Sequence, residues 1–378
     1  MRIAVLGGGP SGLYFAYLMK KRFPAYRIHV REQNARDVTF GFGVVLSGRA
    51  MTFLSEGDSA LVDRLAAVTE SWSDQHFVHR GEQVVIDGSR YSGIARIAML
   101  KILQEACIDA GVEIAYGVRS GPEIARDYDV LVGADGANSV LRDSHTEGFG
   151  TRVVDLQNYF AWYGVQRPYP AHTLTFVQSD LGVFCGHHYR YTPGMSTFVA
   201  EVDARTFAES GMHAMDDDAR RRLTEQVFAE TLGRQPLVSN KSNWRRWRLV
   251  KNDRWSHGNI VLIGDALRTA HPSIGSGTRL AMEDSIALAR AFTAGGTDIA
   301  AIFRRYEETR KPVREKLNRA AELSIDWYER MGEKMGLAPH DLAYDYMLRT
   351  GVMSVERLER DSPQFMARCR AAQPAAVG

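Results

Sequence analysis

The pattern of apolar and polar positions in the first 32 residues predicts a strand, a helix and a second strand. Residues 3–6 form a short apolar run that ends in Gly-Gly-Gly-Pro at 7–10, as a buried strand followed by a turn does. Apolar residues then recur at helical spacing from position 11 to about 22. A second short strand ends at Glu32.

Similar segments recur far apart along the chain. Residues 97–110 have the apolar spacing of a helix, with Gly111 as its stop. Residues 129–132 and 260–263 read as buried strands, each followed by a glycine-containing turn, and a long helix is expected over 277–292. Between them, residues 152–250 alternate aromatic and polar positions, which predicts a mostly antiparallel sheet. Residues 301–348 look helical.

Composition excludes several classes of protein. The formal net charge is +2, from 47 basic and 45 acidic residues, so no electrostatic footprint for nucleic acid or an anionic membrane is present. No apolar stretch approaches the ~20 residues that span a bilayer, and the run at 3–6 is too short for a signal peptide. Cys107, Cys185 and Cys369 are too few and too scattered for a disulfide framework or a zinc site. We therefore expect a soluble, cytoplasmic protein without a metal.

The first motif is Gly7-x-Gly9-x-x-Gly12, with Pro10 and Ser11 inside it, between the first strand and the first helix. Its glycines allow a tight turn, close approach of a diphosphate and tight helix packing, and the helix start favours negative charge. Glu32 follows twenty residues later, where a carboxylate can accept hydrogen bonds from a ribose diol. The motif predicts a dinucleotide without a 2′-phosphate, either FAD or NAD.

Two further motifs distinguish between them. Gly264-Asp265-Ala266 follows a strand, and Pro272-x-x-Gly275-x-Gly277-Thr278 leads into a helix. Asp135-Gly136-x-x-Ser139-x-x-Arg142 follows another strand. Together the three motifs resemble those of the para-hydroxybenzoate-hydroxylase-like family, the group A flavoprotein monooxygenases. The resemblance implies an α/β fold with a Rossmann-like FAD-binding domain, an inserted β-rich substrate domain and C-terminal helices.

The resemblance also implies site residues and boundaries. Asp265 would bond the ribityl chain, and the helix start at Gly275, Gly277 and Thr278 would face the flavin's pyrimidine edge, where it stabilises charge on the reduced ring. Arg96 and Arg49 stand where relatives contact or approach the flavin. The FAD-binding domain would comprise 1–75, 93–150 and 255–320, the substrate domain 76–92 and 151–254, and the helical tail 321–378.

One departure from the family pattern is the Leu267-Arg268 pair, where an Ala-His pair is commonest. Arg268 there could meet an anionic group or face solvent. The mechanism implied by the resemblance is hydroxylation of an aromatic ring with O2 and transiently bound NADH or NADPH, through a flavin C4a-hydroperoxide. A non-hydroxylating flavin protein is the alternative from a different class. Trp244 and Trp247 lack the Trp-x-Trp-x-x-Ile spacing of flavin halogenases.

Several segments resemble a narrower branch, the salicylyl-CoA 5-hydroxylases and anthraniloyl-CoA monooxygenases, and in part the violacein-pathway tryptophan hydroxylases. These segments are 34–48, 162–164, 195–198 and 275–284. The last of them favours an aromatic acyl-CoA thioester as the substrate. The alternative substrate is an indole or tryptophan-type intermediate.

Substrate-site residues are expected on the β-rich segment, whose candidate wall is Trp162, Phe176, Phe184, His187, His188 and Tyr189. By strand alternation only one of His187 and His188 can point inward. That histidine could orient or deprotonate a phenol, or it could be a hydrogen-bonded core residue. Pro272, which opens the loop before the flavin-facing helix, is a further candidate. Trp244, Trp247 and Trp255 are expected to serve packing.

Overall fold

A six-stranded sheet carries the three motifs. The computed structural model describes residues 1–372, so the end of the predicted tail, 373–378, lies outside the described residues. The strands of this sheet are β1 (Arg2–Leu6), β2 (Arg27–Glu32), β8 (Glu113–Tyr116), β9 (Val130–Gly133), β16 (Ser256–His257) and β17 (Ile260–Leu262). Their order is β16-β17-β9-β1-β2-β8, and all neighbours are parallel except β16 and β17. Because β17, β9 and β1 are adjacent and parallel, the loops after them meet at one edge.

Helices cover this sheet and bury its apolar strands. They include α1 (Pro10–Arg22), α4 (Arg96–Ala110) and α11 (Gly277–Gly295). Helix α1 packs against both α4 and α11, and α4 ends at the predicted Gly111, whose φ is +87°. Short elements complete this half of the molecule: α5 (Val140–Asp143), α6 (Thr146–Phe149), α10 (Gly264–Leu267), and the 3-10 turns η1 (Pro122–Asp127) and η3 (Pro272–Ile274).

A three-stranded sheet, which the sequence pattern did not predict, joins the two halves. Its strands are β3 (Gly43–Ser47), β4 (Glu70–Trp72) and β7 (Tyr91–Ala95), in the order β3-β7-β4. Two helices connect β3 to β4, namely α2 (Gly48–Ser55) and α3 (Ser59–Ala66).

The eight-stranded sheet forms the second half. It consists of β5 (Gln75–His79), β6 (Glu82–Ile86), β10 (Thr151–Val165), β11 (His172–Ser179), β12 (Gly182–Thr192), β13 (Met195–Val202), β14 (Leu237–Ser239) and β15 (Arg245–Asn252). The order is β14-β10-β13-β12-β11-β5-β6, with β15 paired to β10. All pairs are antiparallel except β11 with β5, in agreement with the predicted mostly antiparallel sheet.

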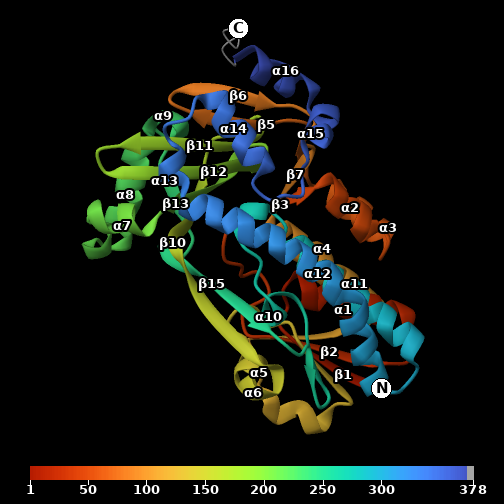
Figure 1. Ribbon diagram of the computed structural model, residues 1–378. Coiled ribbons are helices and arrows are strands. Elements are labelled where there is room, and N and C mark those ends of the chain that lie inside the picture. Colours follow the sequence, from red (N-terminus) through yellow and green to blue (C-terminus); the bar gives the residue numbers. More distant parts are fainter. Residues whose placement is uncertain (373–378) are drawn as a thin grey trace.

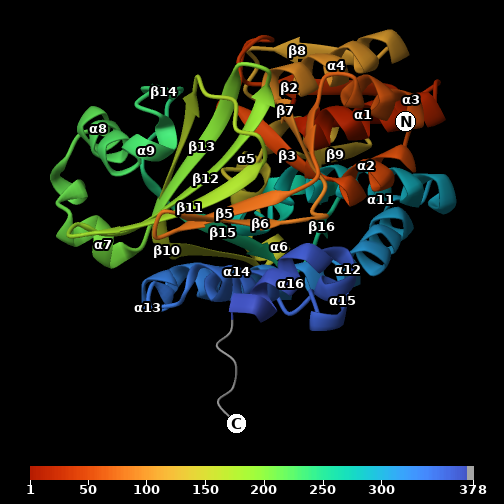
Figure 2. The same ribbon diagram turned by 90° about the horizontal axis from the view of Figure 1, so that it is seen from above.

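Different helices cover the two faces of this sheet. On the outer face, α7 (Ala204–Glu209), α8 (Asp217–Val227) and α9 (Ala229–Leu232), with the turn η2 (Met212–Ala214), enclose a core that includes Phe184 and Phe198. These helices lie within residues 152–250, for which the sequence pattern predicts a mostly antiparallel sheet. On the inner face, C-terminal helices enclose a core that includes Phe77 and Phe176. Figure 2 shows these two groups of helices on different sides of the sheet.

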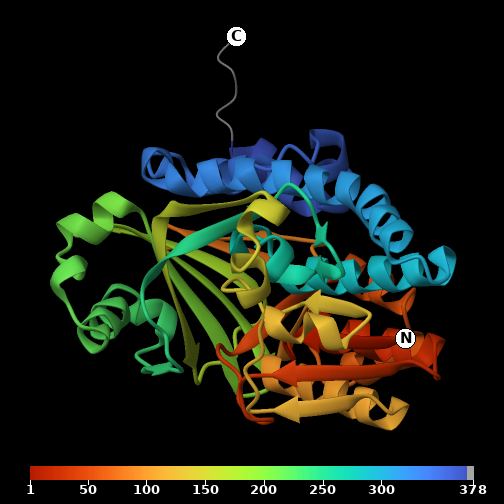
Figure 3. The same cartoon turned by 90° about the horizontal axis from the view of Figure 1, so that it is seen from below.

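The C-terminal helices are α12 (Ile299–Glu329), α13 (Met331–Lys334), α14 (Pro339–Leu348), α15 (Val355–Asp361) and α16 (Pro363–Ala372). Helix α12 runs unbroken through 320–321, where the tail was predicted to begin, and it extends alongside both halves of the molecule (Figures 1 and 3). None of the described helices combines the length and apolar character that crossing a membrane requires.

Candidate active site

The loop between β1 and α1 combines two glycines needed for packing with one that faces open space. Gly7 has a φ of +104°, and a Cβ there would lie 2.3 Å from the carbonyl oxygen of Ala134. A Cβ at Gly12 would lie 2.1 Å from the Gly7 carbonyl oxygen. A Cβ at Gly9 would meet no atom within 4 Å. The start of α1 at Pro10 carries no side-chain cap, so first-turn N–H groups such as that of Ser11 are available to an anion.

Glu32 ends β2 beside this loop. Its Oε2 accepts a hydrogen bond from the Gly8 N–H at 2.7 Å, and its Oε1 accepts one from the Asn34 N–H at 2.7 Å. These bonds fix the carboxylate in place, and an ionised carboxylate has further lone pairs for ligand hydroxyls. The position suits the predicted contact with a ribose.

Asp135 follows β9 and has one paired and one unpaired oxygen. Its Oδ2 accepts from the Val140 N–H at 2.7 Å, whereas its buried Oδ1 has no partner among the described residues. Burial raises the pKa of Asp135. Arg142, from the same motif, donates to the carbonyl oxygens of Ala137 at 2.8 Å and Ala266 at 3.3 Å. Arg142 therefore ties the loop after β9 to the loop after β17.

The loop after β17 carries a buried carboxylate, Asp265, that is influenced by two guanidinium groups. Burial raises the pKa of Asp265, and Arg314 and Arg96 oppose that rise. Arg96 begins α4, and its Nε donates to Thr39 Oγ1 at 3.1 Å. Gly264 has a φ of +61°, and a Cβ there would lie 2.7 Å from Ser11 Oγ. The first and second motifs are thus packed directly against each other.

Helix α11 begins with unpaired N–H groups, because no side chain caps it at Ser276. Gly277 and Thr278 lie in its first turn, and Gly275, with a φ of +58°, precedes them. The body of the helix is held by a buried ion-pair network with α12. In that network Arg310 pairs with Asp284 at 2.8 Å and with Glu283 at 2.8 Å, and Arg314 pairs with Asp284 at 3.1 Å.

These features fit FAD, a dinucleotide with a charged diphosphate. The open space at Gly9 and the uncapped start of α1 suit the diphosphate, and the uncapped start of α11 suits negative charge on the flavin. The unpaired Asp135 Oδ1 can accept a hydrogen bond from a hydroxyl of the cofactor. Gly136, with a φ of +82° and no atom within 4 Å of an added Cβ, adds open space. Arg49 falls in α2, but its side chain lies outside the described part of the structure, so its contact stays a prediction. Arg268 faces Glu322 at 3.5 Å, an anionic group of the chain itself.

On the inner face of the eight-stranded sheet, His187 pairs with Glu201. His187 Nε2 lies 3.1 Å from Glu201 Oε2, and the Glu201 side chain is 0% exposed. Asn158 Nδ2 donates to the other Glu201 oxygen at 2.7 Å. Because a carboxylate only accepts, Nε2 is the donor in this bond, and in the neutral ring Nδ1 keeps its lone pair. This arrangement of a base with an orienting carboxylate suits proton transfer.

His188 points to the outer face, away from His187. Its ring stacks on Phe198 and contacts Tyr169, and its Nε2 is 3.0 Å from Thr175 Oγ1. Burial lowers the pKa of His188 well below its ordinary value. We assign this histidine to the outer core, and the predicted catalytic role falls to His187 alone.

The loop before α11 lies close to the His187 side of the sheet. Pro272 opens the turn η3, and its carbonyl accepts the Gly275 N–H at 2.9 Å. Burial, and next the neighbouring His187, lower the pKa of His271 to about 3. Pro272 therefore shapes the loop through its backbone, while His271 is a buried neutral histidine.

Arg349, from the end of α14, joins this loop to the C-terminal helices. It donates to the Ser273 carbonyl oxygen at 2.8 Å, to Ser324 Oγ at 3.0 Å and to the Tyr346 carbonyl oxygen at 2.8 Å. Its guanidinium lies 3.6 Å from the Tyr346 ring centroid. Arg349 thus fixes the flavin-side loop against the helices that cover the sheet.

Four buried polar atoms around these residues lack a partner among residues 1–372. They are His172 Nδ1, Ser273 Oγ, Tyr328 OH and Trp247 Nε1. Burial, and next His187 and Arg349, lower the pKa of His172 to about 3. Unpaired buried groups are costly unless a ligand or water satisfies them. We call His172, His187, Glu201, Ser273, Tyr328 and Arg349 the polar cluster.

The predicted aromatic wall is divided between the two faces. Tyr189 lies near His172, with ring centroids 5.9 Å apart, and Trp162 lies 5.7 Å from Trp247. Phe184 instead belongs to the outer core. Phe176 packs under the C-terminal helices. Trp244 and Trp255 are core residues, as expected. Trp247 differs, because it stands beside His271 with centroids 6.0 Å apart.

Sequence reasoning missed Glu201 and Arg349. Glu201 sits in an apolar run, Phe-Val-Ala-Glu-Val at 198–202, and a lone acidic residue in a buried strand is a signal that could have indicated it. Arg349 follows the predicted tail helix and carries no local motif.

Comparisons with known proteins agree with this geometry. The FAD binding domain family matches residues 109–321. Salicyloyl-CoA 5-hydroxylase from Streptomyces sp is 34% identical over 364 residues, which cover 93% of this chain and 70% of that protein. 3-Hydroxy-4-methyl-anthranilyl-[aryl-carrier protein] 5-monooxygenase from Streptosporangium sibiricum is 35% identical, over 88% of this chain and 90% of that protein.

A third relative and a solved structure widen the comparison. Protodeoxyviolaceinate monooxygenase from Chromobacterium violaceum is 30% identical, over 92% of this chain and 94% of that protein. The solved structure of 2-methyl-3-hydroxypyridine-5-carboxylic acid oxygenase aligns with a TM-score of 0.72 over 95% of both chains, at 18% identity, and shares the fold. The chain therefore belongs to the FAD-dependent aromatic-ring monooxygenases, which use NAD(P)H and O2.

Proposed function

We propose that this enzyme hydroxylates the ring of an electron-rich aromatic acid presented as a thioester, of the salicyloyl or anthraniloyl type. The observation that carries the proposal is the polar cluster, in which a His187–Glu201 pair at 3.1 Å adjoins unpaired buried atoms beside the flavin-side loop. A phenol placed there would lose its proton to His187 Nδ1 and become a better nucleophile.

The residues have separate roles in this proposal. FAD would be held by Gly9, Glu32, Asp135, Asp265 and the first turn of α11, and its redox chemistry is hydride acceptance from NAD(P)H and activation of O2. Glu201 positions the His187 ring and stabilises its protonated form. The C-terminal helices exclude water from the inner face of the sheet. In the overall reaction, one ring C–H, one O2, one NAD(P)H and one proton are converted to a phenol, water and NAD(P)+.

The charge of the cluster supports a thioester over a free acid. Arg349 already donates three hydrogen bonds within the protein, and the Tyr346 ring lies against its guanidinium. Arg349 is therefore not available to neutralise a free carboxylate. The neutral thioester carbonyl needs only a hydrogen-bond donor. Two relatives act on aryl thioesters by name. An indole-type substrate is the alternative, supported by the violacein-pathway relative.

The test is product formation by the FAD-loaded enzyme in air with NADH and NADPH in turn. The substrates are salicyloyl-CoA, anthraniloyl-CoA, both free acids, tryptophan and an indole. We expect stimulated NAD(P)H oxidation and a product one oxygen atom heavier from the thioesters alone. Product from tryptophan or the indole alone would refute the thioester assignment. We also place the protein in the cytoplasm, a proposal supported by its three free, buried cysteines.

A further inference from the structure

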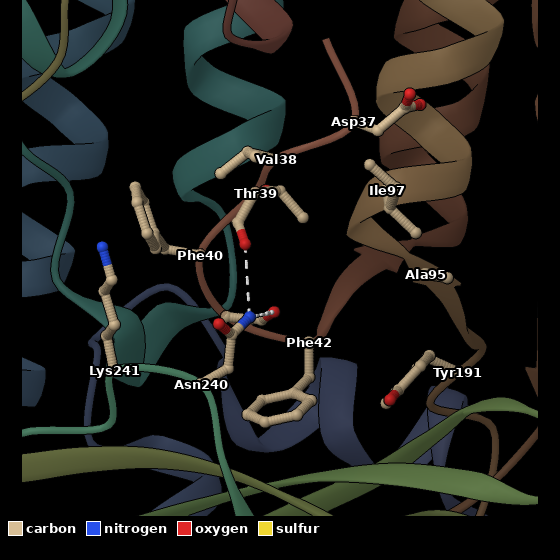
Figure 4. A pocket seen from close by; sticks show the side chains of 11 residues that line it. Asp37, Val38, Thr39, Phe40, Phe42, Ala95, Ile97, Tyr191, Asn240 and Lys241 are labelled. Carbon is tan, nitrogen blue, oxygen red and sulfur yellow. Dashed lines mark hydrogen bonds between the residues drawn. The ribbon is translucent and has the colours of Figure 1, made fainter. Parts of the chain in front are cut away.

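A pocket opens between the loop that precedes β3 and the turn between β14 and β15. Its volume is about 500 Å³. Figure 4 shows Phe40 and Lys241 on one side, Ile97 on the other, and Phe42 with Tyr191 at its base. None of the predicted cofactor residues lines it. The pocket nevertheless adjoins Arg96, whose neighbours Ala95 and Ile97 line it and whose Nε donates to the lining residue Thr39.

The two walls of the pocket are fastened together. Asn240 Nδ2 donates to the carbonyl oxygens of Thr39 and Gly41, both at 3.2 Å. The next residue, Lys241, has a φ of +56°, a conformation that costs a non-glycine residue energy. A strained residue held by its neighbours is a frequent feature of ligand sites.

The rim of the pocket offers both apolar surface and a positive charge. Phe40 is 43% exposed and Val38 is 46% exposed. Lys241 Nζ stands 4.5 Å from the Phe40 ring centroid. Asp37, the acidic residue of the lining, lies 3.7 Å from Lys101 Nζ instead. An apolar stem that ends in an anionic group would satisfy both features.

The pocket and the polar cluster lie along the same strand, β12, with the buried Tyr189 between them. Tyr191 lines the pocket and abuts Gly43, and Tyr189 donates to the Gly43 carbonyl oxygen at 2.9 Å. His187, which belongs to the polar cluster, lies on the same strand two residues before Tyr189 and four before Tyr191. At roughly 3.3 Å per residue, Tyr191 and His187 are about 13 Å apart along the strand.

We propose that this pocket receives the phosphopantetheine arm of the thioester substrate, a ligand class that rests on the proposed function. Pantetheine has two peptide-like amides on short methylene chains, so it resembles about five extended residues, roughly 17 Å. An arm of this length extends from an acyl group near His187 to the rim of the pocket, where Lys241 contacts the phosphate. Phe40 and Phe42 contact the methylene and methyl groups.

Coenzyme A and an acyl-carrier protein both present this arm. The shared chemistry is the phosphopantetheine thioester, and steady-state kinetics with salicyloyl-CoA and with salicyl-loaded carrier protein distinguish the two sources by their KM values. Both ligands use the same pocket, so pocket variants raise both KM values.

The first test is binding of desulfo-CoA to the FAD-loaded protein by titration calorimetry. The variants are Phe40→Ala and Lys241→Ala, and the matched controls are Val313→Ala and Lys316→Ala on the exposed side of α12. We expect about fivefold to tenfold weaker binding for each pocket variant and no change for the controls. Added salt should weaken wild-type binding and leave Lys241→Ala nearly unchanged. Absence of wild-type binding, or equal binding by all variants, overturns the assignment.

The second test separates this inference from the proposed function. Hydroxylation is compared between salicyloyl-CoA and the truncated salicyloyl-N-acetylcysteamine, which lacks most of the arm. The pocket variants should raise KM for the CoA thioester about tenfold without changing kcat, and leave the truncated thioester unaffected. If wild type converts thioesters but the pocket variants behave as the controls do, the pocket assignment is wrong and the proposed function stands. If wild type converts no thioester and binds no desulfo-CoA, both are wrong.

Discussion

We predict that Glu201→Gln slows hydroxylation of a phenolic thioester by about 100-fold without unfolding the protein. Glutamine has nearly the same shape, and its carbonyl oxygen can still accept from Asn158 Nδ2, which now lies 2.7 Å from Glu201 Oε1. The amide nitrogen would then face His187 Nε2, so that two donors meet. His187 loses both its charge partner and its fixed tautomer.

The magnitude follows from the geometry. At the 3.1 Å separation of His187 Nε2 and Glu201 Oε2, two unit charges attract by roughly 5 kcal/mol at an effective dielectric constant near 20. Desolvation of the buried pair offsets a large part of this attraction. A remainder of about 2.7 kcal/mol in the protonated state corresponds to about 100-fold in rate, within the usual range for general base catalysis.

The assay is single-turnover product formation from salicyloyl-CoA and from anthraniloyl-CoA. The amino substrate needs no deprotonation before attack, so its rate should fall far less than that of the phenol. Thr175→Val is the matched control, since it removes a buried partner of His188 on the outer face.

Three outcomes would contradict this reasoning. One is a Glu201→Gln variant that keeps its rate within twofold. Another is an equal loss on both substrates, which indicates a structural role alone. The third is a similar selective loss on the phenol in Thr175→Val, which would remove the distinction between the two faces.

Further predictions concern the cofactor half and stability. Gly9→Ala should keep its melting temperature but retain less FAD, whereas Gly12→Ala should melt lower, because its Cβ would lie 2.1 Å from a backbone oxygen; thermal melts and flavin absorbance check both. Arg310→Met should lower the free energy of unfolding by about 3 kcal/mol, since it leaves Glu283 and Asp284 short of a buried partner; urea titration measures this, and a loss below 1 kcal/mol would count against it. Burial lowers the pKa of His271 to about 3, so the unfolded state binds more protons between about pH 6.5 and 3 and stability falls as the pH drops through this window. At pH 4.5 the loss should be on the order of 2–3 kcal/mol, and His271→Phe should remove that part of the pH dependence.

The cofactor half was predictable because its signals are local in sequence. The turn from β1 into α1 needs a glycine at position 7, where φ is +104°, and at position 12, where a side chain would strike the backbone. Strand and helix periodicity around these glycines is continuous, so both elements follow from the sequence. Parallel strands then bring the loops after β1, β9 and β17 to one edge.

The substrate half could not be predicted to the same depth, because its key contacts depend on strand register. His187 and Glu201 meet only because β12 and β13 pair in the observed register, which places His187 opposite Val199. Alternation correctly indicated that one of the two adjacent histidines faces inward, but it could not say which. The β3-β7-β4 sheet was missed for a similar reason, since its short strands pair across intervening elements, including the β5-β6 hairpin between β4 and β7.

The C-terminal helices do more than cover the sheet, because they also supply residues to the polar cluster. Arg349 comes from the end of these helices, yet it donates to Ser273, 76 residues earlier in the loop that leads to the flavin-facing helix. Tyr328, in α12, supplies an unpaired hydroxyl to the polar cluster. Neither residue belongs to a cofactor motif. Changes at such positions can therefore reshape the substrate side without replacing a residue of the FAD motifs, which gives one flavin fold a route to different aromatic substrates.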